Sequence, residues 1–115
     1  MAIDIAVVRD LIVQRVADIN NPQDVAVRLG MSYHTLRKEF RRKTGMTLGK
    51  FIIQERIKKA KQLLTTTDLL CFEVSYAAGF TREDVAARTF KEHTGMTMQG
   101  YRRRFRVKEE GKGGA

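Results

Sequence analysis

Two stretches of sequence decide the fold: residues 40–51 read FRRKTGMTLGKF, and residues 90–101 read FKEHTGMTMQGY. Both have an aromatic residue at each end and the sequence Thr-Gly-Met-Thr between them. Upstream the match continues at a separation of 49 residues, where Gly30-Met31-Ser32 corresponds to Gly79-Phe80-Thr81. The second copy therefore has one additional residue between its Gly and its Phe. A match this dense predicts that one supersecondary unit occurs twice in the 115 residues.

The first copy predicts a short helix, a turn and a longer helix. The segment Asn21-Pro22-Gln23-Asp24 is typical of a helix start, with Asn as the N-cap, Pro in the first turn and Asp reaching back. Gly30 ends that helix, because glycine readily adopts the left-handed conformation of a C-terminal cap. Ser32 then caps a second helix that runs to Lys43. Two helices joined in this way form a helix-turn-helix.

The second copy predicts the same arrangement. We expect a helix from about Cys71 to Ala78, a turn at Gly79-Phe80, and a cap at Thr81 before a helix that ends near His93. Leu70 stands where the first copy has its capping Asn, so this unit should begin less sharply. The sequence therefore predicts a second helix-turn-helix.

Two further helices are expected around the repeats. An apolar stripe before the first unit predicts an amphipathic helix, formed by Ile5, Val8, Ile12, Val16 and Ile19. Thr47 should cap a helix from about 48 to 64 whose apolar residues cover more than one face. A helix of that kind is expected to be buried from two sides.

Positive charge is concentrated on one part of the chain. The formal net charge is +9, which makes a polyanion the natural partner. Between residues 33 and 61 the only acids are Glu39 and Glu55. The basic residues of that segment are Arg37, Lys38, Arg41, Arg42, Lys43, Lys50, Arg56, Lys58, Lys59 and Lys61. Such a cluster alone is also compatible with a solvated helix surface, but two helix-turn-helix units indicate duplex DNA.

The length of the helix between the units suggests how they meet DNA. At ~1.5 Å per residue it spans roughly 25 Å, so the units can sit about one turn of DNA, ~34 Å, apart. This spacing predicts contact with consecutive major grooves. Because the units differ in sequence, one chain should prefer a non-palindromic site, and a dimer is not required.

The chain resembles the DNA-binding domain of the AraC/XylS family of bacterial transcription regulators over about residues 5 to 105. The resemblance rests on Asp24-Val25-Ala26, Leu29-Gly30-Met31-Ser32, Leu36, Phe40, Thr44-Gly45, Arg56, Lys59-Ala60, Leu63-Leu64, Ala78-Gly79-Phe80, Arg88, Phe90-Lys91, Thr94-Gly95-Met96-Thr97 and Tyr101-Arg102. It implies an all-α fold of about seven helices, with two helix-turn-helix subdomains joined by a long central helix. The expected domain is 1–108 (first unit about 5–46, linker helix about 48–64, second unit about 68–105), and 109–115 is expected to be a flexible tail.

The resemblance also implies which residues meet DNA. The expected base-reading positions are Tyr33, His34, Arg37, Lys38, Arg82, Glu83, Asp84, Ala87 and Arg88. The expected backbone contacts are Ser32, Arg41, Lys43, Lys50, Thr81 and Lys91. The side chain of Arg37 or Lys38 can donate to guanine O6 and N7, and that of His34 can hydrogen-bond to a base edge. Phosphate contacts hold the register without reading sequence.

Two acids in the second unit have two interpretations. Glu83 and Asp84 stand at the start of a helix that should approach a polyanion. They are either ordinary first-turn acids, favoured by the positive helix N-terminus, or acceptors for cytosine N4. Ala86 and Ala87 reduce the bulk of the same helix. We therefore expect base specificity to be concentrated in the first unit.

Other classes of function are weakly supported. His34 and His93 lie in different copies and no Gly-rich phosphate loop is present, so no enzyme, cofactor or metal site is expected. RNA binding would favour more exposed aromatic residues than Tyr33 alone. A protein-interaction domain of the same fold, which reads no DNA, remains the alternative, and the acids of the second unit favour it.

Location and partners follow from the same features. No stretch approaches the ~20 apolar residues of a membrane span, and the lone Cys71 agrees with a reducing compartment. We expect a cytoplasmic protein without a membrane partner. The family resemblance adds contact with RNA polymerase, and dimerisation through a separate sensing or dimerising domain before this one, as expectations.

Overall fold

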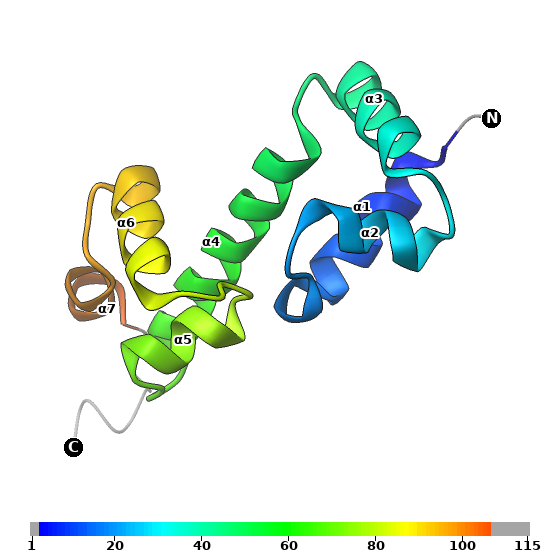
Figure 1. Ribbon diagram of the computed structural model, residues 1–115. Coiled ribbons are helices and arrows are strands. Elements are labelled where there is room, and N and C mark those ends of the chain that lie inside the picture. The colour runs from blue at the N-terminus through cyan, green and yellow to red at the C-terminus, as the bar shows by residue number, and fades with distance from the viewer. Residues whose placement is uncertain (1–2, 107–115) are drawn as a thin grey trace.

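The computed structural model describes residues 3–106, which form seven α-helices and one 3₁₀ helix with no strand among them (Figure 1). The molecule is elongated, with principal extents of 58 × 29 × 22 Å. The elements are α1 (Ile5–Gln14), η1 (Val16–Asp18), α2 (Pro22–Leu29), α3 (Tyr33–Thr44), α4 (Leu48–Thr66), α5 (Cys71–Ala77), α6 (Glu83–Thr94) and α7 (Met98–Phe105). The predicted all-α fold of seven helices is confirmed. The flexible tail predicted for 109–115 lies outside the described residues.

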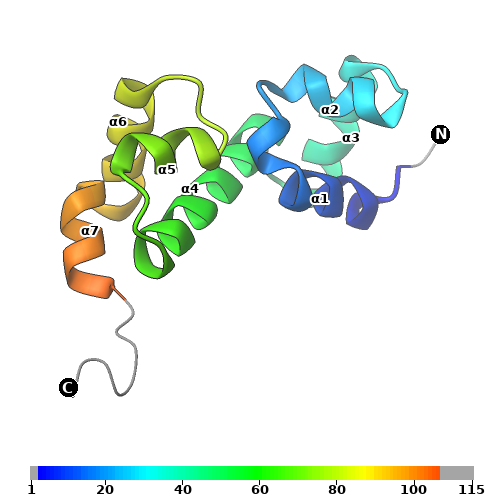
Figure 2. The ribbon, with the colours of Figure 1, turned by 90° about the horizontal axis from the view of Figure 1, so that it is seen from below.

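Helix α4 runs through the middle and connects two helical units (Figures 1 and 2). Helices α1 to α3 surround its first half, and α5 to α7 surround its second half. In the first half Leu48, Phe51 and Ile52 belong to the core of the N-terminal unit. In the second half Ile57 and its neighbours Ala60 and Leu64 belong to the core of the C-terminal unit. The prediction that this helix is buried from two sides is therefore confirmed.

The two Thr-Gly-Met-Thr segments have the same geometry. Gly45 and Gly95 both end a helix with φ 77° and ψ 2°, a left-handed conformation that favours glycine. The hydroxyls of Thr44 and Thr94 donate to the carbonyls four residues earlier, at 2.7 and 2.8 Å. The second Thr of each segment caps the next helix. The repeat thus sets the angle between the second helix of each helix-turn-helix, α3 or α6, and the helix that follows it.

The additional residue of the second copy lies in its turn. The amides of Met31 and Phe80 donate equivalent 3.0 Å hydrogen bonds to Ala26 and Ser75, so the two turns begin alike. Helix α3 then starts directly after Ser32, whereas α6 starts at Glu83, two residues after Thr81. The predicted cap at Thr81 is wrong, because the extra residue places Arg82 at the N-cap, where no side chain makes a capping hydrogen bond.

The ends of three helices can be compared with the predictions. Asn21 caps α2 through a 3.1 Å hydrogen bond from the amide of Asp24, as expected. At α5 the carboxylate of Glu73 accepts from the Leu70 amide at 2.8 Å, which supplies half of a capping box without a polar cap residue. The predicted apolar stripe packs on the first core, with Ile5 half-buried and Val8, Ile12, Val16 and Ile19 buried. However, α1 ends at Gln14 and the stripe continues through η1.

Candidate nucleic-acid interface

Helix α3 separates its core side chains from its polar side chains. Leu36 and Phe40 are fully buried against the first core. The opposite face holds predicted base-reading and phosphate positions, spaced so that they lie side by side on successive turns. His34, Arg37, Lys38 and Arg41 are exposed there, and Tyr33 is half-buried. This face carries three positive side chains and no acid among these five positions.

Helix α6 presents the equivalent face with a different charge. Its positions 83, 84, 87, 88 and 91 lie 50 residues after those of α3, and all five are exposed. Ala86, Thr89 and Phe90 are buried on the other side. Glu83 and Asp84 oppose Arg88 and Lys91, so the formal charges of this face cancel. The two helices thus present one strongly basic surface and one surface without formal net charge.

Arg82 and Asp84 form a bidentate ion pair at the start of α6. The guanidinium Nε and Nη2 donate to the two carboxylate oxygens at 3.0 and 2.8 Å. This hydrogen bonding lowers the pKa of Asp84 below its ordinary value. The pair is therefore present at neutral pH and is lost only as the pH falls through the lowered pKa. Part of the charge of Arg82 is therefore balanced by a carboxylate of the same chain at the protein surface.

A groove lies beside each of these faces, and the two grooves are related by the repeat. The first, of about 500 Å³, lies between α3 and the start of α4. The second, of about 460 Å³, lies between α6, α5 and the start of α7. Thr47, Leu48 and Gly49 line the first, and the equivalent Thr97, Met98 and Gln99 line the second. Amides at helix N-termini attract anions. From the sequence these segments are predicted only as helix boundaries, so this possible role of their amides is not indicated by the sequence pattern.

The predicted backbone contacts fall into two groups. Lys50, Thr81 and Lys91 are exposed, and Ser32 caps α3 while its side chain stays at the surface. Arg41 and Lys91 also line the two grooves. Lys43 differs, because its ammonium donates to the carbonyl of Ile3 at 2.7 Å. The structure thus gives Lys43 a contact within the protein, away from the groove beside α3.

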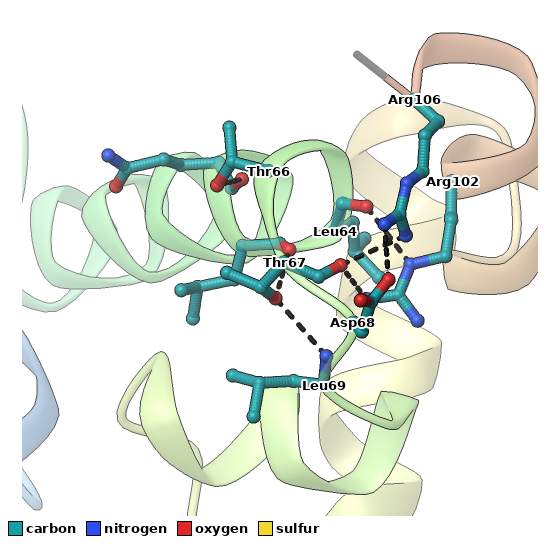
Figure 3. Close-up of polar contacts among 9 residues, drawn as sticks. Leu64, Thr66, Thr67, Asp68, Leu69, Arg102 and Arg106 are labelled. Carbon is teal, nitrogen blue, oxygen red and sulfur yellow. Dashed lines mark hydrogen bonds and ion pairs between the residues drawn. The ribbon is translucent and has the colours of Figure 1, made fainter. Parts of the chain in front are cut away.

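Two arginines of the C-terminal basic run hold the end of α4 (Figure 3). Arg102 donates from Nε to the carbonyl of Leu64 at 3.0 Å and from Nη2 to that of Thr67 at 3.2 Å. Arg106 donates to Thr67 at 3.0 Å and forms an ion pair with Asp68. The last carbonyls of a helix have no partner within it, and Arg102 satisfies that of Leu64 while both arginines bind the carbonyl of the C-cap residue Thr67. Arg102 is half-buried, whereas Arg103 and Arg104 are exposed.

Metal-binding clusters and membrane-spanning helices are both absent from residues 3–106. Among residues 3–106 no group of three or more His, Cys, Asp or Glu side chains is arranged to hold a metal ion. No helix in the described part of the chain has the length and apolar character needed to cross a membrane.

The chain is similar in sequence to known transcription regulators. HTH-type transcriptional activator RhaR of an Enterobacter species is 37% identical over 75 residues, which cover 65% of this chain and 27% of that protein. The Msm operon regulatory protein of Streptococcus mutans is 30% identical over 80 residues, 70% of this chain and 29% of that protein. The chain thus spans less than a third of the length of these curated relatives.

Solved structures share the fold. The C-terminal domain of AraT, a response regulator from Geobacillus stearothermophilus, superposes with a TM-score of 0.82 at 23% identity, covering 92% of this chain and 88% of that one. The DNA-binding domain of AdpA, a global transcriptional factor solved with a target DNA, has a TM-score of 0.79 at 26% identity, covering 87% and 90%.

A family model completes the comparison. The model described as a helix-turn-helix domain matches residues 25–104, which include both turns and the whole of α4. The expected resemblance is confirmed by this match together with the relatives and the solved folds. The chain belongs to the AraC/XylS family of helix-turn-helix DNA-binding domains.

Proposed function

We propose that this domain binds duplex DNA in a sequence-specific manner to regulate transcription, with α3 and α6 in two adjacent major grooves. The observation that carries the proposal is that the repeat places equivalent exposed positions on α3 and α6, which belong to the two units that α4 connects (Figure 1). Helix α4 has 19 residues, a length of about 28 Å. That length suits two units that contact grooves about 34 Å apart.

Base reading is assigned to the exposed face of each helix. On α3 the side chains are Tyr33, His34, Arg37 and Lys38, and guanine is the base that arginine and lysine recognise best. On α6 they are Arg82, Glu83, Asp84, Ala87 and Arg88. All four of these α3 side chains can donate hydrogen bonds, whereas on α6 only the two arginines can. On α6, Ala87 stands in the position equivalent to Arg37, and two acids oppose the arginines. Specificity is therefore concentrated in the first unit.

Phosphate contacts surround these faces. In the first unit these contacts are assigned to Ser32, Arg41 and Lys50. In the second unit they are assigned to Thr81 and Lys91. Lys43 is a weaker candidate because it already donates to Ile3. The amides at the starts of α4 and α7 are further donors, since a helix N-terminus favours an anion. These contacts fix the register on DNA and carry most of the salt dependence.

The relatives support this assignment and suggest wider roles. The curated relatives include a transcriptional activator and an operon regulatory protein, and one structural neighbour was solved with its target DNA. A cytoplasmic location, a non-catalytic role, and contact with RNA polymerase are parts of the same proposal. One chain suffices to contact both grooves in this proposal, and dimerisation through a further domain is compatible with it.

The test is selection of bound sequences from a random duplex library at about 150 mM salt. The proposal predicts one asymmetric motif in two blocks about one helical turn apart, with more information in the block read by α3. It also predicts an affinity that falls by about 10³ to 10⁵ between 50 and 200 mM salt if ~6 to 10 phosphates are contacted. Equal information in both blocks would contradict the assignment of specificity to the first unit.

A protein-interaction domain of the same fold is the second candidate. The cancelling charges of the α6 face are the observation that favours it. That candidate predicts weak DNA binding with little dependence on salt, and no recovered motif. The library selection and its salt series therefore separate the two functions.

A further inference from the structure

We propose that Arg56 is a positioning residue that fixes the orientation of the two helix-turn-helix units, and so the spacing of DNA blocks that the chain accepts. The part about DNA rests on the proposed function, whereas the part about orientation does not. Arg56 lies on α4, between the segments that belong to the first core and those that belong to the second. Its contacts reach both units.

Towards the first unit Arg56 makes hydrogen bonds. Its Nη2 donates to the carbonyl of Ile19 at 2.8 Å and to that of Asn20 at 3.3 Å. These two residues join η1 to α2, so the guanidinium holds the entrance of the first helix-turn-helix. A hydrogen bond from a charged donor is stronger than a neutral one. The contact is therefore a firm attachment of α4 to the first unit.

Towards the second unit Arg56 meets the turn between α5 and α6. Its guanidinium carbon lies 5.4 Å from the centroid of the Phe80 ring, within the range of a cation–π interaction. Phe80 is 4% exposed and belongs to the second core. The guanidinium is thus held between carbonyls of one unit and an aromatic ring of the other.

The backbones of the two units approach each other at the same place. Gly79 has φ 106°, and a Cβ there would lie 2.3 Å from the carbonyl oxygen of Val16 and 3.3 Å from Nε of Arg56. Only a glycine lets the turn of the second unit come this close to η1. Among the described residues, Nε of Arg56 is buried without a hydrogen-bond partner. A tight contact with a desolvated cation leaves little freedom for one unit to rotate against the other.

The repeat supplies a matched residue that lacks the contact between units. Arg106 lies 50 residues after Arg56, and it also donates to the loop before the first helix of its own helix-turn-helix, at Thr67 and Asp68. The attachment of a loop is therefore common to both arginines. The contact with an aromatic ring of the other unit is the additional feature of Arg56. Substituting each arginine in turn separates the two effects.

The first readout is the distance between the units in the absence of DNA. Nitroxides would be placed at the exposed positions Thr35→Cys on α3 and Glu92→Cys on α6, in a Cys71→Ser background, and measured by double electron–electron resonance. We expect one narrow distance distribution for the parent. Arg56→Met should broaden or shift it, and Phe80→Leu should do the same while the hydrogen bonds to Ile19 and Asn20 remain. Arg106→Met should leave it unchanged.

The second readout is tolerance of spacing on the selected DNA. One base pair inserted between the blocks moves one block by about 3.4 Å and about 34° relative to the other. We expect the parent and Arg106→Met to bind the site with the insertion at least about tenfold more weakly than the original site, a change of about 1.4 kcal/mol in binding free energy. Arg56→Met should lose about threefold or less, with helicity and affinity for a single block unchanged.

The outcomes are separable. Failure of the parent to bind any sequence specifically would overturn the proposed function, and the distance measurement would still decide the role of Arg56. Distributions with the same mean distance and the same width in the parent, Arg56→Met and Phe80→Leu would overturn the positioning role. Equal broadening by Arg106→Met would also overturn it, because a general loss of loop attachment would then explain the effect.

Discussion

At the scale of single residues, Arg37 is the side chain with the clearest expected effect on specificity. It is exposed in the middle of the α3 face and lines the first groove. Because a bidentate contact to guanine discriminates by about 1 to 3 kcal/mol, Arg37→Ala should lose that much on the preferred site. On unrelated DNA the loss should be smaller. Fluorescence anisotropy titrations on both duplexes provide the comparison.

Arg42→Ala is the matched control for this change. Arg42 lies on the same helix, but its guanidinium is hydrogen-bonded to Glu39 at 2.6 Å, which lowers the pKa of Glu39 and raises that of Arg42. Removing it deletes the same charge with little expected effect on base choice. If Arg37→Ala weakened all sequences equally, as a lost phosphate contact would, its role as a base reader would be wrong.

Asp84 decides between the two interpretations of the acids in α6. Its carboxylate is hydrogen-bonded by Arg82, so Asp84→Asn removes a negative charge and loosens the arginine. If the acid is an ordinary first-turn residue, DNA binding should strengthen on every sequence and the salt slope should steepen by about 1. Weaker binding restricted to sites with a particular cytosine would instead identify a cytosine acceptor.

The side chains of the interface could be predicted only in part. The spacing of the repeat placed the α3 positions on one exposed face, because the helical period fixes which residues share a face. The extra turn residue was placed wrongly, since sequence alone does not say whether it lengthens the turn or the helix. The contacts of Lys43 with Ile3 and of Arg102 with Leu64 join distant segments. No local pattern marks such contacts.

At the scale of elements, α7 is expected to stabilise the end of α4. Arg102 satisfies carbonyls at Leu64 and Thr67, and hydrogen bonds from charged groups contribute about 1.5 to 3 kcal/mol. Arg102→Ala should lower the free energy of unfolding by roughly 1 to 3 kcal/mol in a urea titration. Arg103→Ala, which removes an exposed charge from the same helix, should change it by about 0.5 kcal/mol or less. Equal losses in the two variants would show that the carbonyl contacts add nothing.

Helices were more predictable than their junctions. Polar caps at Asn21, Ser32 and Thr47 fixed the starts of α2, α3 and α4 to the residue, because a capping side chain bonds a defined amide. The break between α1 and η1 was missed, since the apolar stripe continues through it. The end of α4 at Thr66 was placed two residues early, because its attachment by arginines from α7 is tertiary.

At the scale of the whole molecule, one repeated unit has acquired two different surfaces. The cores are equivalent: Phe40 packs on Phe51 at 5.5 Å between centroids, and Phe90 packs on Tyr101 at 5.4 Å. The exposed faces differ, with three basic side chains among five positions on α3 and cancelling charges on α6. The two units thus share a fold, and the difference between their exposed faces is the basis of the proposed asymmetric reading of DNA.

The central claim is that one chain contacts two consecutive major grooves, and methylation interference on the selected duplex tests it most directly. Guanine N7 lies in the major groove, so methylation there blocks a contact made from α3 or α6. With one chain bound per duplex, we predict interference in two patches about 10 to 10.5 base pairs apart, centre to centre, on one side of the DNA. A single patch, or two patches that require two chains, would contradict the account.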